Sequence, residues 1–190
     1  VILAYVGRIA PEKRVDLLIE AFPKIRAATE RRVALMFVGG GPALDGLKAR
    51  GVEGVHFAGY RRGEDLAAHY ASADAFVFPS DTETFGQVVT EAMASGLPVV
   101  APARGGVMDT VIPGETGYLF EPGDTDAIAE SALRLVEDDE LRARLSVQAR
   151  SAAEARSWEG VFDRLFADYA EALSGGDDPV TTATPVRAVS

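Results

Sequence analysis

Short apolar runs bounded by Gly or Pro alternate along this chain with stretches of helical periodicity. The runs that predict strands are Ile2–Val6, Val33–Val38, Val55–Phe57, Ala75–Phe78, Val99–Ala101 and Tyr118–Phe120. Between the first two runs, Val15, Leu18, Ile19 and Phe22 follow the i, i+3, i+4, i+7 spacing that gives a helix one apolar face. The alternation predicts an α/β fold, a Rossmann-like parallel sheet of about six strands with helices on both faces.

Further amphipathic helices are predicted over Glu64–Ser72, Gln87–Ala94 and Thr125–Val136, the last with Asp124 as its N-cap. After residue 137 the strand pattern stops and the chain becomes helical, first over Leu141–Ala155. These helices follow the sheet in the chain and extend the fold at its C-terminal end.

A last helix carries apolar and aromatic residues on one face, namely Trp158, Val161, Phe162, Leu165, Phe166 and Tyr169. We interpret this stripe as core or as a docking surface, and as a docking surface we expect part of it to be exposed where its partner is absent. Beyond Leu173 all periodicity is lost, so residues 174–190 are predicted to be a mobile tail. Residues 1–173 are predicted to form one domain.

Composition and charge narrow the class of protein. The 190 residues include 47% hydrophobic ones, as in an ordinary soluble globular domain. With 29 acidic and 19 basic side chains the formal charge is -10, which argues against bulk attraction to nucleic acid or anionic lipid. An anionic ligand must therefore meet a local basic cluster. The expected location is the cytoplasm, or the inner face of the membrane for a peripheral full-length protein.

Three absences from the sequence exclude further classes. The chain has no Cys, which excludes a disulfide framework, a zinc ribbon and a cysteine nucleophile. No stretch approaches the ~18 uninterrupted apolar residues of a membrane span. The sequence opens inside an apolar run, Val1–Val6, without an initiator Met, so we expect it to be a fragment of a longer protein.

The first candidate site is the loop Gly7–Lys13, which follows a predicted strand and precedes a helix. It carries two cations, Arg8 and Lys13, at the carboxyl edge where open parallel sheets bind ligands. A guanidinium and an ammonium group suit a diphosphate. The alternative, which the residues leave equally open, is a solvated loop whose cations offset a neighbouring acid such as Glu12.

The second candidate is Gly39-Gly40-Gly41-Pro42, at the end of the second predicted strand. Glycines there allow the backbone to approach a ligand closely. The segment is not a dinucleotide fingerprint, because Leu44 stands where a third glycine is required, and no Gly-Lys-Ser/Thr follows. Taken alone, a tight turn with Pro at the start of a helix is the simpler interpretation.

The third candidate, Pro79–Glu91, again follows a strand and opens a helix. Its first amides, near Thr84 to Val88, and the helix dipole favour an anion, and two carboxylates, Glu83 and Glu91, bracket the turn. Carboxylates accept well from vicinal sugar hydroxyls, so a ligand that is part phosphate and part polyol is indicated. The alternatives are a stabilising first-turn acid at Glu83 and a solvated helix face at Glu91, although the helix around Glu91 is otherwise apolar.

Together these residues resemble the C-terminal donor-binding domain of the group 1 (family 4) retaining glycosyltransferases of GT-B fold. The motifs, in chain order, are Gly7-Arg8 with Lys13, Gly39-Gly40-Gly41-Pro42, Glu83 with Glu91, the run Glu91–Val100, and Gly114-Glu115-x-Gly117-x-Leu119. The likeness covers residues 1 to about 173. Within the family it is greatest to bacterial lipid-directed mannosyl- and glucosyltransferases and to sulfoquinovosyl-diacylglycerol synthases.

The resemblance implies a role for each matching position. Arg8 and Lys13 would hold the donor diphosphate and neutralise the leaving group, and Glu83 would hold hydroxyls of the transferred hexose. Glu91 would bind the ribose hydroxyls. The other implied donor-binding residues are Gly7, Gly39, Gly40, Gly41, Tyr60, Arg61, Thr84, Phe85, Gly86, Gln87 and Val88, with Tyr60 and Arg61 near the base and the amides of Phe85, Gly86 and Gln87 near sugar and phosphate.

The resemblance also implies the reaction: a hexosyl group passes from GDP-mannose or a UDP-hexose to an acceptor, a lipid or a glycan, with retention of configuration. No metal or other cofactor is expected. In the family an N-terminal acceptor domain precedes this region, so the isolated chain should bind donor but have little activity. The alternative is a non-catalytic nucleotide-sugar binding module.

Other chemistry-bearing residues have simpler explanations. Asp124-Thr125-Asp126 matches a metal-binding D-x-D pattern, but an N-cap followed by a first-turn acid explains it better. His56 and His69 lie away from the motif loops and are interpreted as structural. Arg104, which follows the fifth strand, and Arg62 and Arg14 are expected to add to the positive charge of the cleft or to lie in solvent.

Overall fold

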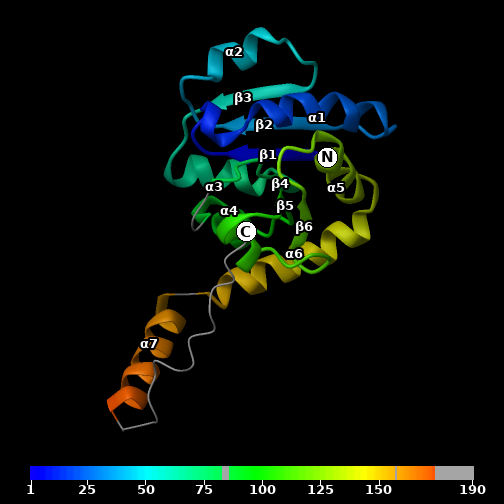
Figure 1. The fold of residues 1–190 in the computed structure, drawn as a ribbon. Coiled ribbons are helices and arrows are strands. Elements are labelled where there is room, and N and C mark those ends of the chain that lie inside the picture. The colour runs from blue at the N-terminus through cyan, green and yellow to red at the C-terminus, as the bar shows by residue number, and fades with distance from the viewer. Residues whose placement is uncertain (83–85, 157, 174–190) are drawn as a thin grey trace, which may run out of the picture. The chain divides into compact units, whose positions relative to one another are not determined.

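The computed structural model describes residues 1–82, 86–156 and 158–173. The chain divides into two units, Val1–Glu154 and Ala155–Ser190. In the first unit, one sheet contains β1 (Ile2–Val6), β2 (Ala34–Val38), β3 (Val55–Gly59), β4 (Ala75–Val77), β5 (Val99–Pro102) and β6 (Gly117–Phe120). All pairings are parallel, in the order β3-β2-β1-β4-β5-β6 (Figure 1). The predicted six-stranded parallel sheet is confirmed, and each predicted run lies on a strand.

Helices connect the strands and cover both faces of the sheet. They are α1 (Asp16–Ala27), α2 (Leu44–Ala49), α3 (Gly63–Ala71), α4 (Gln87–Ala94), α5 (Thr125–Glu137) and α6 (Asp139–Glu154), with short 3-10 helices η1 (Pro11–Lys13) and η2 (Gly105–Asp109). The chain leaves β1 toward β2 but leaves β4 toward β5, in opposite directions across the sheet. Because such crossovers are right-handed, α1 and α4 lie on opposite faces, where α1 packs beside α5 and α4 beside α6 (Figure 1).

The core forms because helices cover both faces of the sheet. The strands β4 and β5 are buried along their whole length, as helices require of a sheet that they cover on both faces. A row of aromatic rings crosses the centre, with Tyr5 next to Phe37 (centroids 5.5 Å apart) and Phe78 (6.5 Å), and Phe78 next to Phe76 (6.1 Å). This rigid centre supports the loops at the carboxyl ends of β1 and β4.

The start of α5 confirms the interpretation of Asp124 as an N-cap. Its carboxylate accepts hydrogen bonds from the backbone N–H groups of Asp126 and Ala127, both at 2.9 Å. Asp126 itself forms an ion pair of 2.5 Å with Lys24 of α1. Asp124 therefore caps α5, and Asp126 links α5 to α1.

Replacing the cap should have a defined cost. We expect Asp124→Ala to lower the free energy of unfolding by about 1 kcal/mol, because two helix N–H groups lose their acceptor. Asp124→Asn, which keeps an acceptor oxygen, should retain most of that stability. Urea unfolding of both variants measures the difference, and an equal loss in the two would contradict the capping role.

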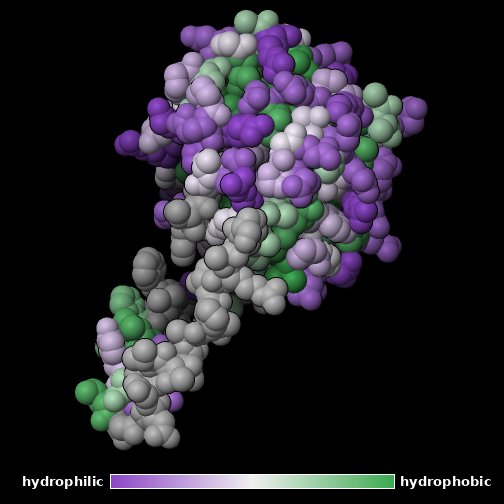
Figure 2. Space-filling model, viewed as in Figure 1, coloured by the Kyte–Doolittle hydropathy of each residue, from purple (hydrophilic) through white to green (hydrophobic). Residues whose placement is uncertain are grey.

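The second unit is described by itself as one helix, α7 (Trp158–Leu173). Phe162, Leu165, Phe166 and Tyr169 are exposed, and Figure 2 shows hydrophobic residues at the surface of this helix. The interpretation of the stripe as core is therefore wrong for these four side chains, which are exposed in the part of the chain that the structure describes, and its interpretation as a docking surface stays a prediction. The tail predicted over 174–190 lies outside the described residues. No helix among the described residues is long and apolar enough to span a membrane.

Candidate functional site

A cavity of about 570 Å³ opens at the carboxyl ends of β1, β2 and β3, and we call it the carboxyl-edge cavity. Its lining consists of Val6, Gly7, Arg8, Val38, Gly39, Gly40, Tyr60, Arg61, Arg62, Gly63, Leu66, Val88 and Glu91. Since the strand order reverses between β1 and β4, the cavity lies at the switch point where doubly wound sheets bind ligands. The structure thus brings together residues from all three motif loops.

A buried tyrosine stabilises the loop after β1 through a hydrogen bond. The hydroxyl of Tyr5, a fully buried residue, donates to the carbonyl oxygen of Arg8 at 2.8 Å. Arg8 lines the cavity, and its guanidinium donates to Glu12 at 2.8 Å, with 63% of the Arg8 side chain and 49% of the Glu12 side chain exposed. The ion pair agrees with the interpretation of Arg8 as a cation that offsets Glu12, and diphosphate binding by Arg8 stays a prediction. An exposed ion pair of this kind contributes little, so a more highly charged anion can displace Glu12.

The glycines after β2 pack against the loop after β1. Gly7 N–H donates to Val38 O at 3.0 Å, and Ile9 N–H donates to Gly40 O at 2.9 Å. A Cβ atom on Gly39 would stand 1.9 Å from Gly7 O, and one on Gly41 would stand 2.3 Å from Ile9 O. These two glycines therefore allow the neighbouring backbone to approach closely.

Gly40 differs from both of its neighbours. A Cβ atom built on it meets nothing within 4 Å, and its backbone lines the cavity. Gly40 is therefore the position in this turn at which a side chain would enter the space available to a ligand.

One wall of the cavity is a tyrosine and two arginines at the end of β3. Arg62 Nε donates to the Tyr60 hydroxyl at 2.7 Å, and the Arg62 guanidinium carbon lies 4.9 Å from the centroid of the Tyr60 ring. Arg61 Nε lies 3.3 Å from the Asp65 carboxylate. This wall gives the cavity an aromatic face and positive charge in a chain whose net charge is -10.

Glu91, on α4, also lines the cavity. It is an exposed residue although the helix around it is apolar, and its carboxylate accepts a hydrogen bond of 3.1 Å from the Tyr70 hydroxyl. Val88, one turn earlier on α4, also lines the cavity. The ladder of α4 begins at the Val89 N–H, which donates to Gly86 O at 2.8 Å, so the preceding amides of Gln87 and Val88 are the positive end of the helix dipole.

The segment with Glu83, Thr84 and Phe85 lies outside the described residues. Its neighbour Asp81 forms an ion pair of 3.6 Å with Arg14, and the Thr82 hydroxyl donates to the Glu12 carbonyl oxygen at 3.4 Å. The chain just before Glu83 therefore contacts the loop that carries Arg8 and Lys13.

Some predicted residues lie apart from the cavity lining. The described residues that line the cavity do not include Lys13, Gly41, Gly86 or Gln87. Lys13 ends η1 and is half-buried. Arg104 is exposed and caps η2, and it too is not among the described lining residues.

The sequence analysis did not identify two tyrosines that contact site residues. Tyr5 holds the Arg8 loop and Tyr70 contacts Glu91. A buried tyrosine generally finds a partner for its hydroxyl, so both were candidates for a polar role. Their partners depend on how the strands and helices pack, which local periodicity does not report.

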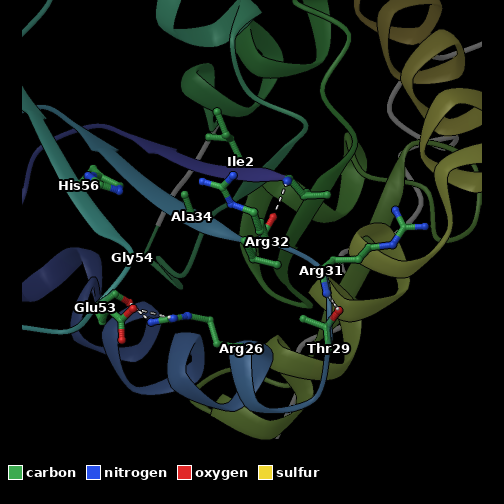
Figure 3. A pocket seen from close by; sticks show the side chains of 11 residues that line it. Ile2, Arg26, Thr29, Arg31, Arg32, Ala34, Glu53, Gly54 and His56 are labelled. Carbon is green, nitrogen blue, oxygen red and sulfur yellow. Dashed lines mark hydrogen bonds and ion pairs between the residues drawn. The ribbon is translucent and has the colours of Figure 1, made fainter.

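A second cavity, of about 610 Å³, lies at the opposite edge, where β1, β2 and β3 begin (Figure 3). It is rich in arginine, but Arg26 donates to both the carbonyl and the carboxylate of Glu53, and Arg31 forms an ion pair of 2.5 Å with Asp139. The hydrogen bond from Arg26 lowers the pKa of Glu53. None of the predicted site residues lies there, and two of its arginines are neutralised by acids.

Comparison with known proteins decides the family. The glycosyl transferases of group 1 match residues 1–152. The chain belongs to this family. The resemblance inferred from the motif residues is confirmed. Among the group 1 relatives, a GDP-mannose-dependent alpha-mannosyltransferase of Mycobacterium tuberculosis is 41% identical over 92% of this chain and 43% of its own length. Sulfoquinovosyl transferase SQD2 of Arabidopsis thaliana is 39% identical over 86% of this chain and 32% of its own.

Solved structures agree with the GT-B fold of the group 1 family. Anabaena Alr3699/HepE in complex with UDP and glucose superposes with a TM-score of 0.76 at 27% identity, over 90% of this chain and 48% of that one. The C-terminal domain of a group 1 protein, LpcC of Francisella tularensis, gives 0.70 at 25% identity, over 82% of this chain and 84% of that domain. The chain thus spans less than half the length of the curated relatives named above.

Proposed function

We propose that this chain binds the donor of a hexosyltransferase, a nucleoside diphosphate sugar, and that the full-length enzyme transfers the hexose to an acceptor with retention of configuration. The observation that carries the proposal is the composition of the carboxyl-edge cavity, which places Arg8, the backbone of Gly40, and Glu91 around one space of about 570 Å³. Cations and free backbone suit a diphosphate, and a carboxylate suits sugar hydroxyls.

The diphosphate is assigned to the side of the cavity that carries Arg8. Its guanidinium, whose ion-pair partner Glu12 is itself exposed to solvent, offers a bidentate donor face. The amides at the start of α4 add the positive end of a helix dipole. Lys13, on the same loop as Arg8, is proposed to reach the phosphates as donor binds and to neutralise the charge that develops on the leaving group.

The nucleoside is assigned to the remaining walls. Glu91 accepts from the ribose hydroxyls, and the base lies at the turn with Tyr60 and Arg61. The transferred hexose is assigned to Glu83 and to the amides of residues 85–87. Of these, Gly86 and Gln87 are described, and they open α4 beside the cavity residue Val88.

The relatives support a nucleotide sugar but leave its base open. The mycobacterial relative is named for GDP-mannose, whereas the Anabaena structures hold UDP, UDP with glucose, or UDP-glucose. We prefer GDP-mannose, because the mannosyltransferase is the more similar in sequence, 41% against 27% identity. No metal is proposed to take part.

The missing partner is proposed to be an N-terminal acceptor domain of the same protein. The LpcC domain, which is a C-terminal domain and is matched over 84% of its length, supports this chain being the corresponding half. The exposed apolar face of α7, with Phe162 and Phe166, is proposed to dock on that N-terminal domain. The acceptor is a lipid or a glycan.

Calorimetric titration of this chain with GDP, UDP and ADP, first without metal and then with Mg²⁺, tests donor binding. We expect one diphosphate to bind without metal and Glu91→Ala to weaken it by roughly tenfold, the effect of a lost hydrogen bond to a charged group. Gln148→Ala, on α6, is a control that should leave the affinity unchanged. Failure of all three nucleotides to bind either this chain or the full-length protein would contradict the proposal.

Transfer activity distinguishes the enzyme from a binding module. If the full-length protein binds the nucleotide sugar but releases neither sugar nor nucleoside diphosphate in the presence of lipid and glycan acceptors, the chain is a non-catalytic nucleotide-sugar module. Anomeric configuration of the product, read by nuclear magnetic resonance, tests retention.

A further inference from the structure

Tyr70 is a buried polar residue that directly contacts the proposed ribose site from outside the cavity. It lies on α3 and is 3% exposed, and its hydroxyl donates to Glu91 Oε2 of α4 at 3.1 Å. Tyr70 does not itself line the carboxyl-edge cavity, whereas Glu91 does. The hydrogen bond therefore reaches a cavity carboxylate from the protein side.

The ring of Tyr70 is fixed by the aromatic core. Its centroid lies 6.2 Å from that of Phe76 on β4, tilted by 47°, and Phe76 stacks on Phe78. Rings packed in this way have few rotamers, so the position of the hydroxyl is set by the sheet. Glu91, by contrast, is an exposed side chain with several rotatable bonds, and such a side chain loses substantial rotamer entropy when a ligand orders it.

The Tyr70 hydroxyl is a permanent donor. Burial and, after it, the neighbouring Glu91 carboxylate both raise the pKa of Tyr70 well above its ordinary value. The phenol therefore keeps its proton throughout the range in which enzymes work. A carboxylate has about four acceptor positions on its two oxygens, so after accepting from Tyr70 it still has positions for two vicinal hydroxyls.

We propose that Tyr70 is a positioning residue that holds the Glu91 carboxylate in the orientation required to accept from both ribose hydroxyls. The inference rests on the proposed function, in which Glu91 binds ribose. Preorganisation of this kind raises affinity because the ordering cost is met in the free protein. Its consequence is selectivity: a nucleotide that lacks the 2′-hydroxyl loses a contact that depends on the carboxylate being correctly oriented.

The test compares ribonucleotides with their 2′-deoxy analogues. Dissociation constants are measured by calorimetry for GDP against 2′-deoxy-GDP and for UDP against 2′-deoxy-UDP, in the unmodified chain and in Tyr70→Phe, Glu91→Ala and the double variant. Tyr70→Phe removes only the hydroxyl and keeps the ring against Phe76. Tyr118→Phe serves as the matched control. It removes a hydroxyl from a residue of β6, and no residue of β6 is among the described residues that line the cavity.

We expect the unmodified chain to prefer the ribonucleotide by roughly tenfold, and Glu91→Ala to abolish the preference. Tyr70→Phe should reduce the preference to about threefold, because Glu91 remains but is no longer fixed. In the Glu91→Ala background the same change should add nothing, since the two residues act through one contact. Tyr118→Phe should keep the full preference. Thermal melting of Tyr70→Phe shows that the fold is retained.

Each other outcome has a definite meaning. A Tyr70→Phe variant that is folded and keeps the full ribose preference overturns the positioning role while leaving the ribose role of Glu91 intact. An unmodified chain that binds nucleotide without any ribose preference overturns both. If Tyr70→Phe also changes the ribose preference in the Glu91→Ala background, Tyr70 acts through the fold and not through Glu91. That result also overturns the inference.

Discussion

Gly39→Ala is expected to lower the free energy of unfolding by about 3 kcal/mol or more. The added Cβ would stand 1.9 Å from Gly7 O, a backbone atom held by the hydrogen bond from Gly7 N to Val38 O. The φ angle of Gly39, 142°, is also one that residues with side chains rarely adopt. Either the β1 loop or the β2 loop must move.

Thermal melting measures this effect, and two glycines provide matched controls. For a domain of this size the loss corresponds to a drop of roughly 6–12 °C in Tm. Gly46→Ala, inside α2 where an added Cβ meets nothing within 4 Å, should be neutral or slightly stabilising. Gly40→Ala should also fold normally. A Gly39→Ala variant as stable as Gly46→Ala would mean that the two loops are not packed as described.

Gly40→Ala separates the stability of the turn from its role in binding. Its methyl group would enter the carboxyl-edge cavity, so under the proposed function it should weaken diphosphate binding while Tm stays unchanged. The sequence shows three identical glycines here, and the structure divides them. Two are required by neighbouring backbone, and only at the third, Gly40, does an added methyl group meet open space.

The strands and most helices could be predicted because their patterns are local. A parallel sheet covered on both faces requires continuous apolar runs, and the run at Ala75–Phe78 is such a case, since every residue of β4 is buried. Pro42 was interpreted as the start of a helix, but the extent of the short helix α2 was not predicted. This helix offers only Leu44, Leu47 and Ala49 as apolar positions and contains Gly46, so that neither periodicity nor propensity marks it.

The site was less accessible to sequence reasoning because contacts between loops decide it. Arg8 was predicted as a cavity cation from its place after β1, and it lines the cavity. That Tyr5 fixes the loop and Tyr70 reaches Glu91, 21 residues away, depends on packing of the core that spacing along the chain does not encode. Lys13 shares the loop with Arg8, yet η1 turns it to a half-buried position outside the described lining.

Arg8→Ala in the full-length enzyme is expected to reduce kcat by about 10²–10³-fold, the usual cost of losing a group that stabilises charge in a transition state. Under the proposed function the diphosphate gains negative charge as the hexose departs, and Arg8 on the loop after β1 is a cation that lines the cavity. Lys13→Ala should show a loss of similar size if its ammonium group reaches the same phosphates. Steady-state kinetics with the preferred nucleotide sugar provide kcat and KM for each variant.

Two further variants show whether the loss comes from charge at this position. Arg150→Ala removes a cation from an exposed ion pair with Glu154 on α6, where 64% and 63% of the side chains are exposed, and should leave kcat unchanged. Glu12→Gln removes the partner of Arg8 and should change kcat by less than about fivefold, because an exposed ion pair contributes at most about 1 kcal/mol. If Arg8→Ala raises KM with kcat intact, Arg8 binds donor and leaving group equally well. Another group would then neutralise the departing diphosphate. The kcat of Lys13→Ala shows whether that group is Lys13, the other cation of the loop.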